Sequence, residues 1–365
     1  MSTHTPLYDA HVAHGAKLVD FAGWTMPLQY SGVLDEYQAV RHQAGLFDVS
    51  HMGRIAISGK GALEFLQLVT TNDVAKLEEH QAQYSMVCNP DGGVKDDVFV
   101  YRLEKDNYLL CANASNRTKI LEWVIQQHQE FQESVEVQDQ STPMGQLALQ
   151  GPQGETILRE AVGNSYDRLK PRRSLEVRIL GTATLVARTG YTGEIGYELY
   201  VPADQALPLW DYLIEIGKPY GLKPAGLGAR DLLRLDMGYF LYGNELTEDI
   251  TPLEAGAEWV VAFPKGKFIG ASSLQRQQQE GVTRRLIGFE LLEKAVPRHG
   301  MTIYREGRNI GEVTSGNLSP VLQKGIGMGY VSTEHSQVGT SLQIQVRGRL
   351  VPAVVVKPPF YKRGG

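Results

Sequence analysis

The sequence has few cysteines and no long apolar run. Its 365 residues contain two cysteines, Cys88 and Cys111, which do not form a CxxC pair. Two separate thiols exclude a disulfide framework and a thiolate metal site, and they favour a reducing cytoplasm. We expect both to behave as small buried hydrophobic residues. Because no apolar run is long enough to cross a bilayer and no apolar segment follows a basic start, we predict neither a membrane span nor a secretory signal.

A strong charge bias and the common cofactor motifs are also missing. The formal net charge of -5 is spread over both signs, with no basic block longer than a pair such as Arg172–Arg173, which argues against a nucleic-acid binder. The segment 59–64 has only two of the three glycines of a dinucleotide motif, and no HExxH motif is present. His11 and His14 are spaced as HxxH, but no further ligand supports a metal. We therefore expect solvated histidines on a helix.

What is present is a soluble-type composition, 42% hydrophobic and 21% charged, on a chain long enough for two or three domains. From Gly53 the pattern of hydrophobic residues predicts the order β–α–β–β–β–α, and the same order recurs after Pro143. This predicts two related α+β units with antiparallel sheets. In the first unit, Ser115 or Asn113 is expected to cap the helix. From Arg284 onward, short strands separated by glycines predict a small β-barrel or jelly roll.

Two adjacent aspartates stand out in the first unit. Residues 89–93 are turn formers, and 94–103 reads as a strand that begins with Asp96 and Asp97. Because side chains alternate along a strand, Asp97 shares the face of Phe99 while Asp96 points to the other face. Either both aspartates cap the turn through local hydrogen bonds, or a buried carboxylate serves a chemical purpose.

A second polar anomaly lies in the strand of residues 196–201, where Glu198 shares a face with Gly196. Glycine inside a strand often marks the close approach of a ligand or of another backbone. A carboxylate beside such a gap suits the N–C–NH₂ edge of a flat ring, and Tyr191 is placed to stack on that ring. The alternative is an edge-strand glutamate in water.

A third anomaly is the pair Arg230 and Arg234, which are four residues apart on one helix face after a glycine-rich entry. Surface ion pairing with Asp231 or Glu245 is one interpretation. Recognition of an anionic or carbonyl-bearing ligand at the start of the helix is the other.

Several blocks of the sequence resemble one family. In chain order they are "TPLYDAHVAHGAKLVDFAGWTMPLQY", "GLFDVSHMG", "TNDV", "GGVKDDVFVY", "RTGYTGEIGYELYVP", "PAGLGARDLLRLDMGYFLYGNEL", "TSGNLSP" and "KPPFYKR". These blocks resemble the T-protein family of the glycine cleavage system, the tetrahydrofolate-dependent aminomethyltransferases. The resemblance extends from about Thr5 to Lys362.

The resemblance implies three domains around a central folate site. They are a folate-binding α+β domain of residues 1–52 and 141–275, an inserted α+β domain of residues 53–140 with the catalytic hairpin, and a C-terminal β-barrel of residues 282–365. The catalytic carboxylate would be Asp97, buried where positive charge develops on the attacking nitrogen. Glu198 would hold the pterin edge. The other implied folate-site residues are Tyr191, Arg230, Met52, Tyr84, Asn113, Tyr242 and Trp259.

One residue departs from the family pattern. Lys95 stands where the family usually places an apolar residue before the aspartates, and from there it can pair with Asp96 or Asp97 and lower the pKa of that carboxyl group.

The implied substrate is an aminomethyl group on the lipoyl arm of a small carrier, the H-protein. Tetrahydrofolate accepts the methylene group as co-substrate and ammonia is released, with no metal and no nucleotide. Two alternatives are a folate-dependent demethylase on the same scaffold and a non-catalytic folate-binding protein. The second is disfavoured because that branch carries a cysteine motif in its second half, whereas this chain has no cysteine after Cys111.

Overall fold

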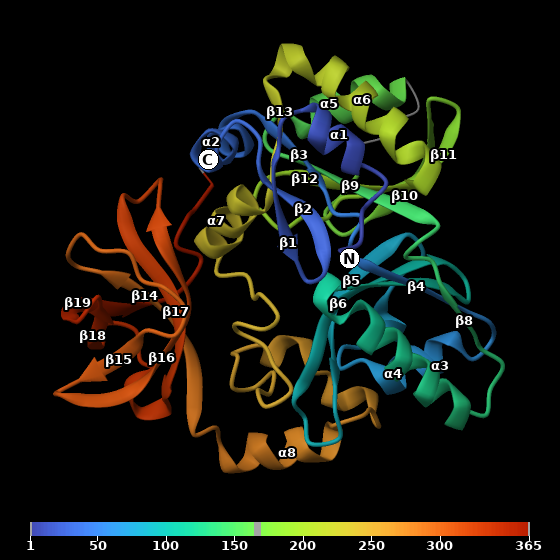
Figure 1. Cartoon of the computed structure of the whole chain (residues 1–365). Coiled ribbons are helices and arrows are strands. Elements are labelled where there is room, and N and C mark those ends of the chain that lie inside the picture. The colour runs from blue at the N-terminus through green and yellow to red at the C-terminus, as the bar shows by residue number, and fades with distance from the viewer. Residues whose placement is uncertain (1, 164–168, 364–365) are drawn as a thin grey trace. The chain divides into compact units, whose positions relative to one another are not determined.

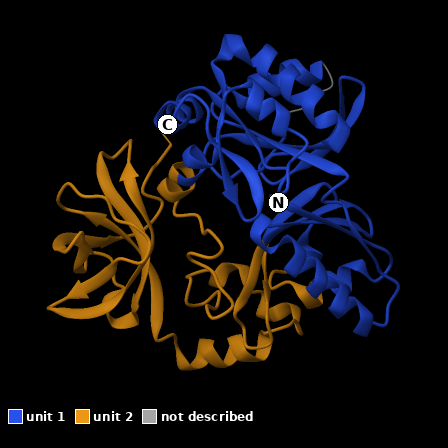
Figure 2. Cartoon of the chain, viewed as in Figure 1, with its two compact units in different colours: residues 1–66, 74–84, 98–231 blue, residues 67–73, 85–97, 232–365 orange. Residues whose placement is uncertain are grey.

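A computed structural model describes residues 2–163 and 169–363 of the chain (Figure 1). The chain divides into two compact units (Figure 2). Unit 1 comprises residues 1–66, 74–84 and 98–231, and unit 2 comprises residues 67–73, 85–97 and 232–365.

The first of the two predicted α+β units contains a five-stranded sheet with the strand order β5-β6-β7-β4-β8. Strand β4 pairs antiparallel with both β7 and β8, and β6 pairs antiparallel with β7. Its elements are β4 (Gly53–Ser58), α3 (Ala62–Val69), β5 (Gln81–Cys88), β6 (Val94–Glu104), β7 (Asn107–Ala112), α4 (Arg117–Glu130) and β8 (Glu136–Asp139).

The second sheet has the order β10-β11-β12-β9-β3-β13. Its elements and the helices beside them are β3 (Ala44–Asp48), β9 (Met144–Gln150), α5 (Gly154–Val162), β10 (Ser174–Ile179), β11 (Thr182–Ala187), β12 (Gly196–Pro202), α6 (Ala206–Gly217) and β13 (Leu222–Pro224). The order β10-β11-β12-β9 repeats the order β5-β6-β7-β4, so the predicted recurrence is confirmed. The strands of this sheet pair antiparallel, as predicted, except at one edge, where β13 pairs parallel with β3.

Strand β12 shows how the sequence builds this sheet. Its residues alternate, so that Tyr197, Leu199 and Val201 enter the main apolar core of unit 1. Trp210 of α6 is fully buried in the same core. The opposite face of β12 carries Glu198, which is why one strand both anchors the sheet and presents a carboxylate.

The C-terminal strands form a closed barrel in the order β14-β17-β16-β15-β18-β19, and β14 pairs with β19 to close it. The predicted barrel is therefore confirmed. Alternating apolar residues such as Phe289, Ile303 and Val313 fill its interior. The elements are α8 (Ala271–Glu280), β14 (Arg284–Leu291), β15 (Thr302–Arg305), β16 (Arg308–Ser319), β17 (Lys324–Ser332), β18 (Ser341–Val346) and β19 (Arg349–Val356).

The N-terminal part and the connections supply the remaining elements. They are α1 (Tyr8–Ala13), β1 (Lys17–Phe21), β2 (Trp24–Gln29), α2 (Val33–His42) and α7 (Leu227–Met237), and the 3-10 turns η1 (Val74–Lys76), η2 (Ala114–Asn116), η4 (Ala203–Gln205), η5 (Lys218–Tyr220), η6 (Glu258–Val260), η7 (Phe263–Lys265) and η8 (Thr333–His335). Within the described ranges, none of the helices has the length and apolar character needed to span a membrane.

Two local predictions are wrong. His11 is fully buried rather than solvated, with Nε2 2.9 Å from Asp48 Oδ2 and Nδ1 2.9 Å from the Tyr30 hydroxyl. His14 is exposed as expected. The 3-10 turn η2 precedes helix α4, so α4 begins after Asn116 and not after Ser115 or Asn113. Neither the start of η2 at Asn113 nor the start of α4 at Asn116 has a side-chain capping hydrogen bond. Cys88 and Cys111 are buried free thiols, as predicted.

Candidate active site

The residues predicted for the site belong to both units. Unit 1 contains Glu198, Arg230, Tyr191, Tyr84, Asn113 and Met52. Unit 2 contains Asp97, Tyr242 and Trp259.

Burial alternates regularly at the start of β6. Asp96 is fully buried, whereas Asp97 is half-buried on the face that also carries Lys95. The expectation that Asp97 is the buried aspartate is therefore wrong for this structure, because regular alternation places Asp96 with the buried Val94 and Val98. The Nζ atom of Lys95 lies 3.1 Å from Glu248 Oε2, which gives this lysine a carboxylate partner from another segment.

The turn before the two aspartates is capped by Asn89. Its Oδ1 accepts hydrogen bonds from the backbone N–H groups of Asp91, at 3.0 Å, and Gly93, at 2.9 Å. The N–H of Gly92 donates to the Asn89 carbonyl at 3.0 Å. The Asn89 side chain therefore caps this turn.

The same turn is docked against residues 247–250 of unit 2. The Val94 N–H donates to the carbonyl oxygens of Thr247, at 3.1 Å, and Ile250, at 2.8 Å. At Gly93 a Cβ atom would lie 1.7 Å from the Glu248 carbonyl oxygen. Only glycine allows this backbone approach, which positions the start of β6.

Tyr242, one of the predicted site residues, is close enough to Asp96 and Asp97 for their charges to act on its hydroxyl group. Burial, followed by the charges of Glu248, Asp96 and Asp97, raises the pKa of the Tyr242 hydroxyl above its ordinary value, so it remains a protonated donor. Trp259 lies in η6 and is 61% exposed.

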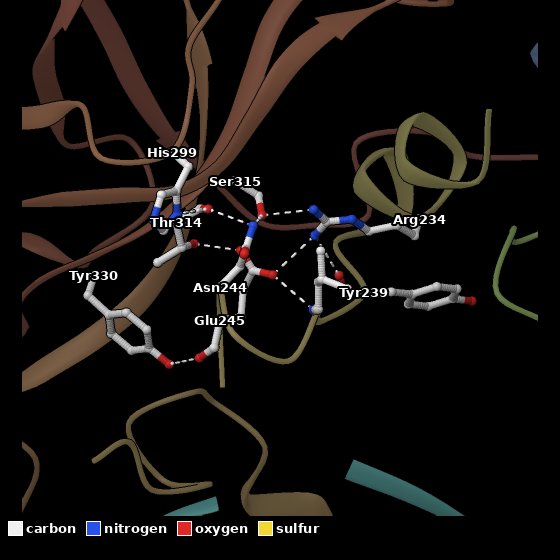
Figure 3. Close-up of polar contacts among 9 residues, drawn as sticks. Arg234, Tyr239, Asn244, Glu245, His299, Thr314, Ser315 and Tyr330 are labelled. Carbon is white, nitrogen blue, oxygen red and sulfur yellow. Dashed lines mark hydrogen bonds and ion pairs between the residues drawn. The ribbon is translucent and has the colours of Figure 1, made fainter. Parts of the chain in front are cut away.

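A buried polar network holds the segment that contains Tyr242 (Figure 3). Arg234 Nη1 lies 3.1 Å from Glu245 Oε2, and Arg234 Nη2 donates to the Ser315 hydroxyl at 2.8 Å. Glu245 also accepts from the Leu241 N–H at 2.9 Å and from the Thr314 hydroxyl at 2.6 Å. The predicted partner of Arg234 is thus correct, but the pair is buried rather than on the surface.

Glu198 receives three side-chain hydrogen bonds. Its Oε1 accepts from Gln146 Nε2 at 3.2 Å, and its Oε2 accepts from the hydroxyls of Tyr101, at 3.3 Å, and Thr189. Because β12 lies between β11 and β9, the alternative of an edge-strand glutamate in water is wrong. A half-buried carboxylate fixed by neutral donors is suited to accept further N–H groups.

Arg230 and Tyr191 form the second part of this arrangement. The Arg230 guanidinium carbon lies 4.6 Å from the centroid of the Tyr191 ring, a cation–π distance. Burial lowers the pKa of Arg230, and Tyr191 and Glu198 act in the opposite direction. The three predicted residues therefore interact within unit 1.

Two residues that were not predicted hold the loop with Tyr191 in place. Gln150 is buried, donates to the Thr189 carbonyl at 3.2 Å and accepts from the Thr192 hydroxyl at 2.9 Å. Arg41 is also buried, and its Nη1 lies 2.6 Å from the Thr192 carbonyl and 2.8 Å from Glu194 Oε1. Gly196 was interpreted as marking the close approach of a ligand or of another backbone. In the structure, the Gln150 side chain fills the space beside Gly196.

The remaining predicted residues of unit 1 are half-buried. Met52 packs against the apolar cluster that contains Tyr101 and Cys111. The ring of Tyr84 lies edge-on to Phe99 at 5.6 Å. Asn113 directly precedes η2.

His51 was missed although it precedes Met52 in a recognised block. It is 2% exposed, and its buried Nδ1 has no hydrogen-bond partner. Burial lowers the pKa of His51 to about 3, with Asp48 acting to raise it and Arg230 to lower it. The imidazole is therefore neutral in the folded protein at neutral pH.

Because His51 is buried in its neutral form, we expect it to contribute to the loss of stability at acid pH. Below the ordinary histidine pKa of 6.5 the unfolded chain binds a proton that the folded chain binds only near pH 3, so this residue makes stability fall as pH drops from about 6.5 to 3. The variant His51→Gln should lose less stability across that window in urea titrations. The exposed His14→Gln is the control, and equal pH slopes for wild type and His51→Gln would contradict the assignment.

Within residues 2–163 and 169–363, no group of three or more His, Cys, Asp or Glu side chains is arranged to hold a metal ion. The Glu198 carboxylate is a hydrogen-bond acceptor, which suits an organic ligand with N–H groups.

Known proteins resemble this chain over its whole length. Residues 7–265 match the family model of the GCVT N-terminal domain, and residues 284–362 match that of the glycine cleavage T-protein C-terminal barrel domain. An aminomethyltransferase from Desulforamulus reducens is 47% identical over 359 residues, 98% of each chain, and one from Bacillus subtilis is 45% identical over 365 residues, 100% of each chain. The crystal structure of a glycine cleavage system aminomethyltransferase T from Bartonella henselae has a TM-score of 0.92 at 34% identity and covers 100% of this chain and 99% of that chain. The chain therefore belongs to the glycine cleavage T-protein family of aminomethyltransferases.

Proposed function

We propose that this aminomethyltransferase transfers the methylene group of an aminomethyl-lipoyl carrier protein to tetrahydrofolate. The observation that carries the proposal is the Glu198 carboxylate, which accepts hydrogen bonds from Gln146, Thr189 and Tyr101 while Tyr191 and Arg230 stack nearby in the same unit. A carboxylate fixed in this way is suited to the amino-pyrimidinone edge of a pterin.

In the proposed reaction, one folate nitrogen forms a bond to the methylene carbon of the S–CH₂–NH₂ group and a second folate nitrogen then closes the methylene bridge. The two protons that these nitrogens lose end on the departing ammonia and on the thiol of the carrier arm. Ammonia leaves, the carbon–sulfur bond breaks, and the products are methylenetetrahydrofolate and the dihydrolipoyl arm. Positive charge develops on the attacking nitrogen. Asp97 is proposed to stabilise that charge and to accept the proton.

The proposal also includes partners and further site residues. The carrier is the H-protein of the glycine cleavage system, and no metal or nucleotide takes part. Met52, Tyr84, Asn113, Tyr242 and Trp259 are proposed as further folate-site residues. The two buried free thiols support action in a reducing cytoplasm. The division into three domains stays a prediction.

The deciding experiment measures ammonia release from aminomethylated lipoyl H-protein with and without tetrahydrofolate. We expect rapid release only when folate is present, with methylenetetrahydrofolate formed in equal amount. A folate-dependent demethylase would release no ammonia, and a non-catalytic binding protein would leave the carrier unchanged. Comparable turnover on free aminomethyl-lipoate at the same concentration would overturn the requirement for a carrier.

The role of Glu198 predicts a specific loss of affinity. Glu198→Gln keeps the shape of the side chain but removes its charge, so tetrahydrofolate binding should weaken by about 1.5–3 kcal/mol, the range for a hydrogen bond to a charged group. Calorimetry measures this change. The exposed Glu176→Gln on β10 is a matched control, and equal affinity for the two variants would refute the role of Glu198.

A further inference from the structure

Arg54 is a buried cation in unit 1, and its side chain donates hydrogen bonds to neutral groups. It is fully buried on β4, and its Nη2 donates to the carbonyl oxygens of Ser50, at 2.9 Å, Met144, at 3.0 Å, and Ser141. Among the residues that the structure describes, no carboxylate forms an ion pair with it. A buried guanidinium without a carboxylate is costly, so the contacts that it does make need an explanation.

The informative contact of Arg54 is with Gln146. Arg54 Nη1 donates to Gln146 Oε1 at 3.2 Å. Because a guanidinium has only donors, this contact assigns the oxygen of the Gln146 amide to the Arg54 side. The amide nitrogen must then point the other way, where it donates to Glu198 Oε1 and to the Tyr200 hydroxyl, each at 3.2 Å.

A chain of hydrogen bonds, each donated in the same direction, leads from Gln146 to the second carboxylate oxygen of Glu198. Tyr200 accepts from Gln146 and donates to the Tyr101 hydroxyl at 3.0 Å, and Tyr101 donates to Glu198 Oε2 at 3.3 Å. Burial raises the pKa of both tyrosines well above the ordinary value, so both keep their protons. Both oxygens of Glu198 therefore receive donors whose orientation begins at Arg54.

We propose that Arg54 and Gln146 are positioning residues that orient the hydrogen bonds to Glu198 and so hold this carboxylate in place to accept N–H groups of its ligand. The inference rests on the proposed function, since the ligand class is the N–H donor edge of a reduced pterin. Gln146 thereby makes the site selective for ring edges that present two donors.

The substitution Gln146→Glu tests this orientation through pH. When protonated, the new carboxyl group can donate to Glu198 as the amide does. When ionised, it places a second negative charge beside Glu198 and removes the donor. Two adjacent carboxylates raise the pKa of one of them, so this variant should bind tetrahydrofolate nearly as wild type does at low pH and more weakly as pH rises.

The other titratable groups around Glu198 do not produce such a profile between pH 6 and 9. Burial raises the pKa of Cys111, whose Sγ lies 3.8 Å from Gln146 Oε1, to about 12. The two tyrosines stay protonated, and the guanidinium groups of Arg54 and Arg230 stay charged. A pH dependence confined to Gln146→Glu therefore reports on residue 146.

The measurement is the dissociation constant of tetrahydrofolate by calorimetry from pH 6 to 9, together with KM and kcat for ammonia release. For Gln146→Glu we expect affinity to fall by about 10- to 100-fold as the new carboxyl group ionises, with the change in KM for folate rather than in kcat. Gln146→Met removes the donor at every pH and should weaken binding to a similar extent without pH dependence. The exposed Gln138→Glu on β8 is the matched control.

The outcomes separate the inference from the function on which it rests. Wild-type protein that does not bind tetrahydrofolate overturns the proposed function and the inference with it. Wild-type protein that binds, with Gln146→Glu and Gln146→Met both unchanged at every pH, overturns the inference alone. Circular dichroism shows whether each variant is folded, and if Gln146→Glu fails to fold, the Gln146→Met affinity decides.

Discussion

Replacement of Asp97 by asparagine is expected to lower the turnover number by about 10²- to 10⁴-fold, the usual contribution of general acid–base catalysis. The substitution keeps the size and the hydrogen-bonding shape of the side chain but removes its charge and basicity. Because Asp97 is only half-buried on its strand face, we expect little change in stability. Steady-state ammonia release measures turnover, and calorimetry should show that the affinity for folate falls far less.

The neighbouring residue provides the control. Asp96 is fully buried on the opposite face of β6, so Asp96→Asn should lower the free energy of unfolding by about 1–3 kcal/mol, the cost of disturbing a buried polar group. Its turnover should stay within several-fold of wild type. If Asp96→Asn loses turnover and Asp97→Asn retains it, the catalytic role belongs to the buried aspartate and our assignment is wrong.

Gly93→Ala is expected to destabilise the protein strongly. The new Cβ atom would lie 1.7 Å from the Glu248 carbonyl oxygen and 2.6 Å from the carbonyl carbon. Residues 89–93 would have to move away from 247–250, which would break the hydrogen bonds of the Val94 N–H. Overpacking and lost hydrogen bonds together predict a loss of about 3 kcal/mol in the free energy of unfolding. Activity should fall as well, because the displaced residues lead directly into Asp96 and Asp97.

A second glycine shows whether the effect is specific. Gly154 begins α5, and a Cβ atom there would lie 3.7 Å from its nearest neighbour, an ordinary contact distance. Gly154→Ala should therefore change stability by less than about 1 kcal/mol and leave activity intact. Urea unfolding of both variants measures the difference. Equal free energies of unfolding for Gly93→Ala and Gly154→Ala would show that the backbone around residue 93 adjusts to the new methyl group without loss of stability.

The recurrent element order and the barrel were predictable because they depend on local hydrophobic spacing. The alternation in β12 also placed Glu198 and Tyr197 on opposite faces correctly. His11 was misjudged because its partner, Asp48, is distant in sequence, and the HxxH spacing carries no sign of it. A buried histidine and an exposed one can have identical local patterns, as His11 and His14 do.

The polar residues behind the site were missed for a related reason. Gln146 and Gln150 alternate with apolar residues on β9, and nothing local indicates that one contacts Glu198 and the other Thr189. Gly196 was noticed, but the atom that approaches it belongs to Gln150 and not to a ligand. Sequence patterns identified Glu198 and Gly196, but their partners Gln146 and Gln150 became apparent only from the pairing of β9 with β12.

The closure of the barrel bears on how the chain folds as it is synthesised. Its first strand, β14, pairs with its last strand, β19, and beyond β19 the N–H groups of Phe360 and Tyr361 donate to the carbonyl of Asp236 in α7. Pairing between segments so distant in sequence is slow to form. On the ribosome, the edge of β14 that pairs with β19 therefore stays unpaired until residues 349–356 have been synthesised. An unpaired strand edge is prone to aggregation, so this interval is one in which the barrel is vulnerable.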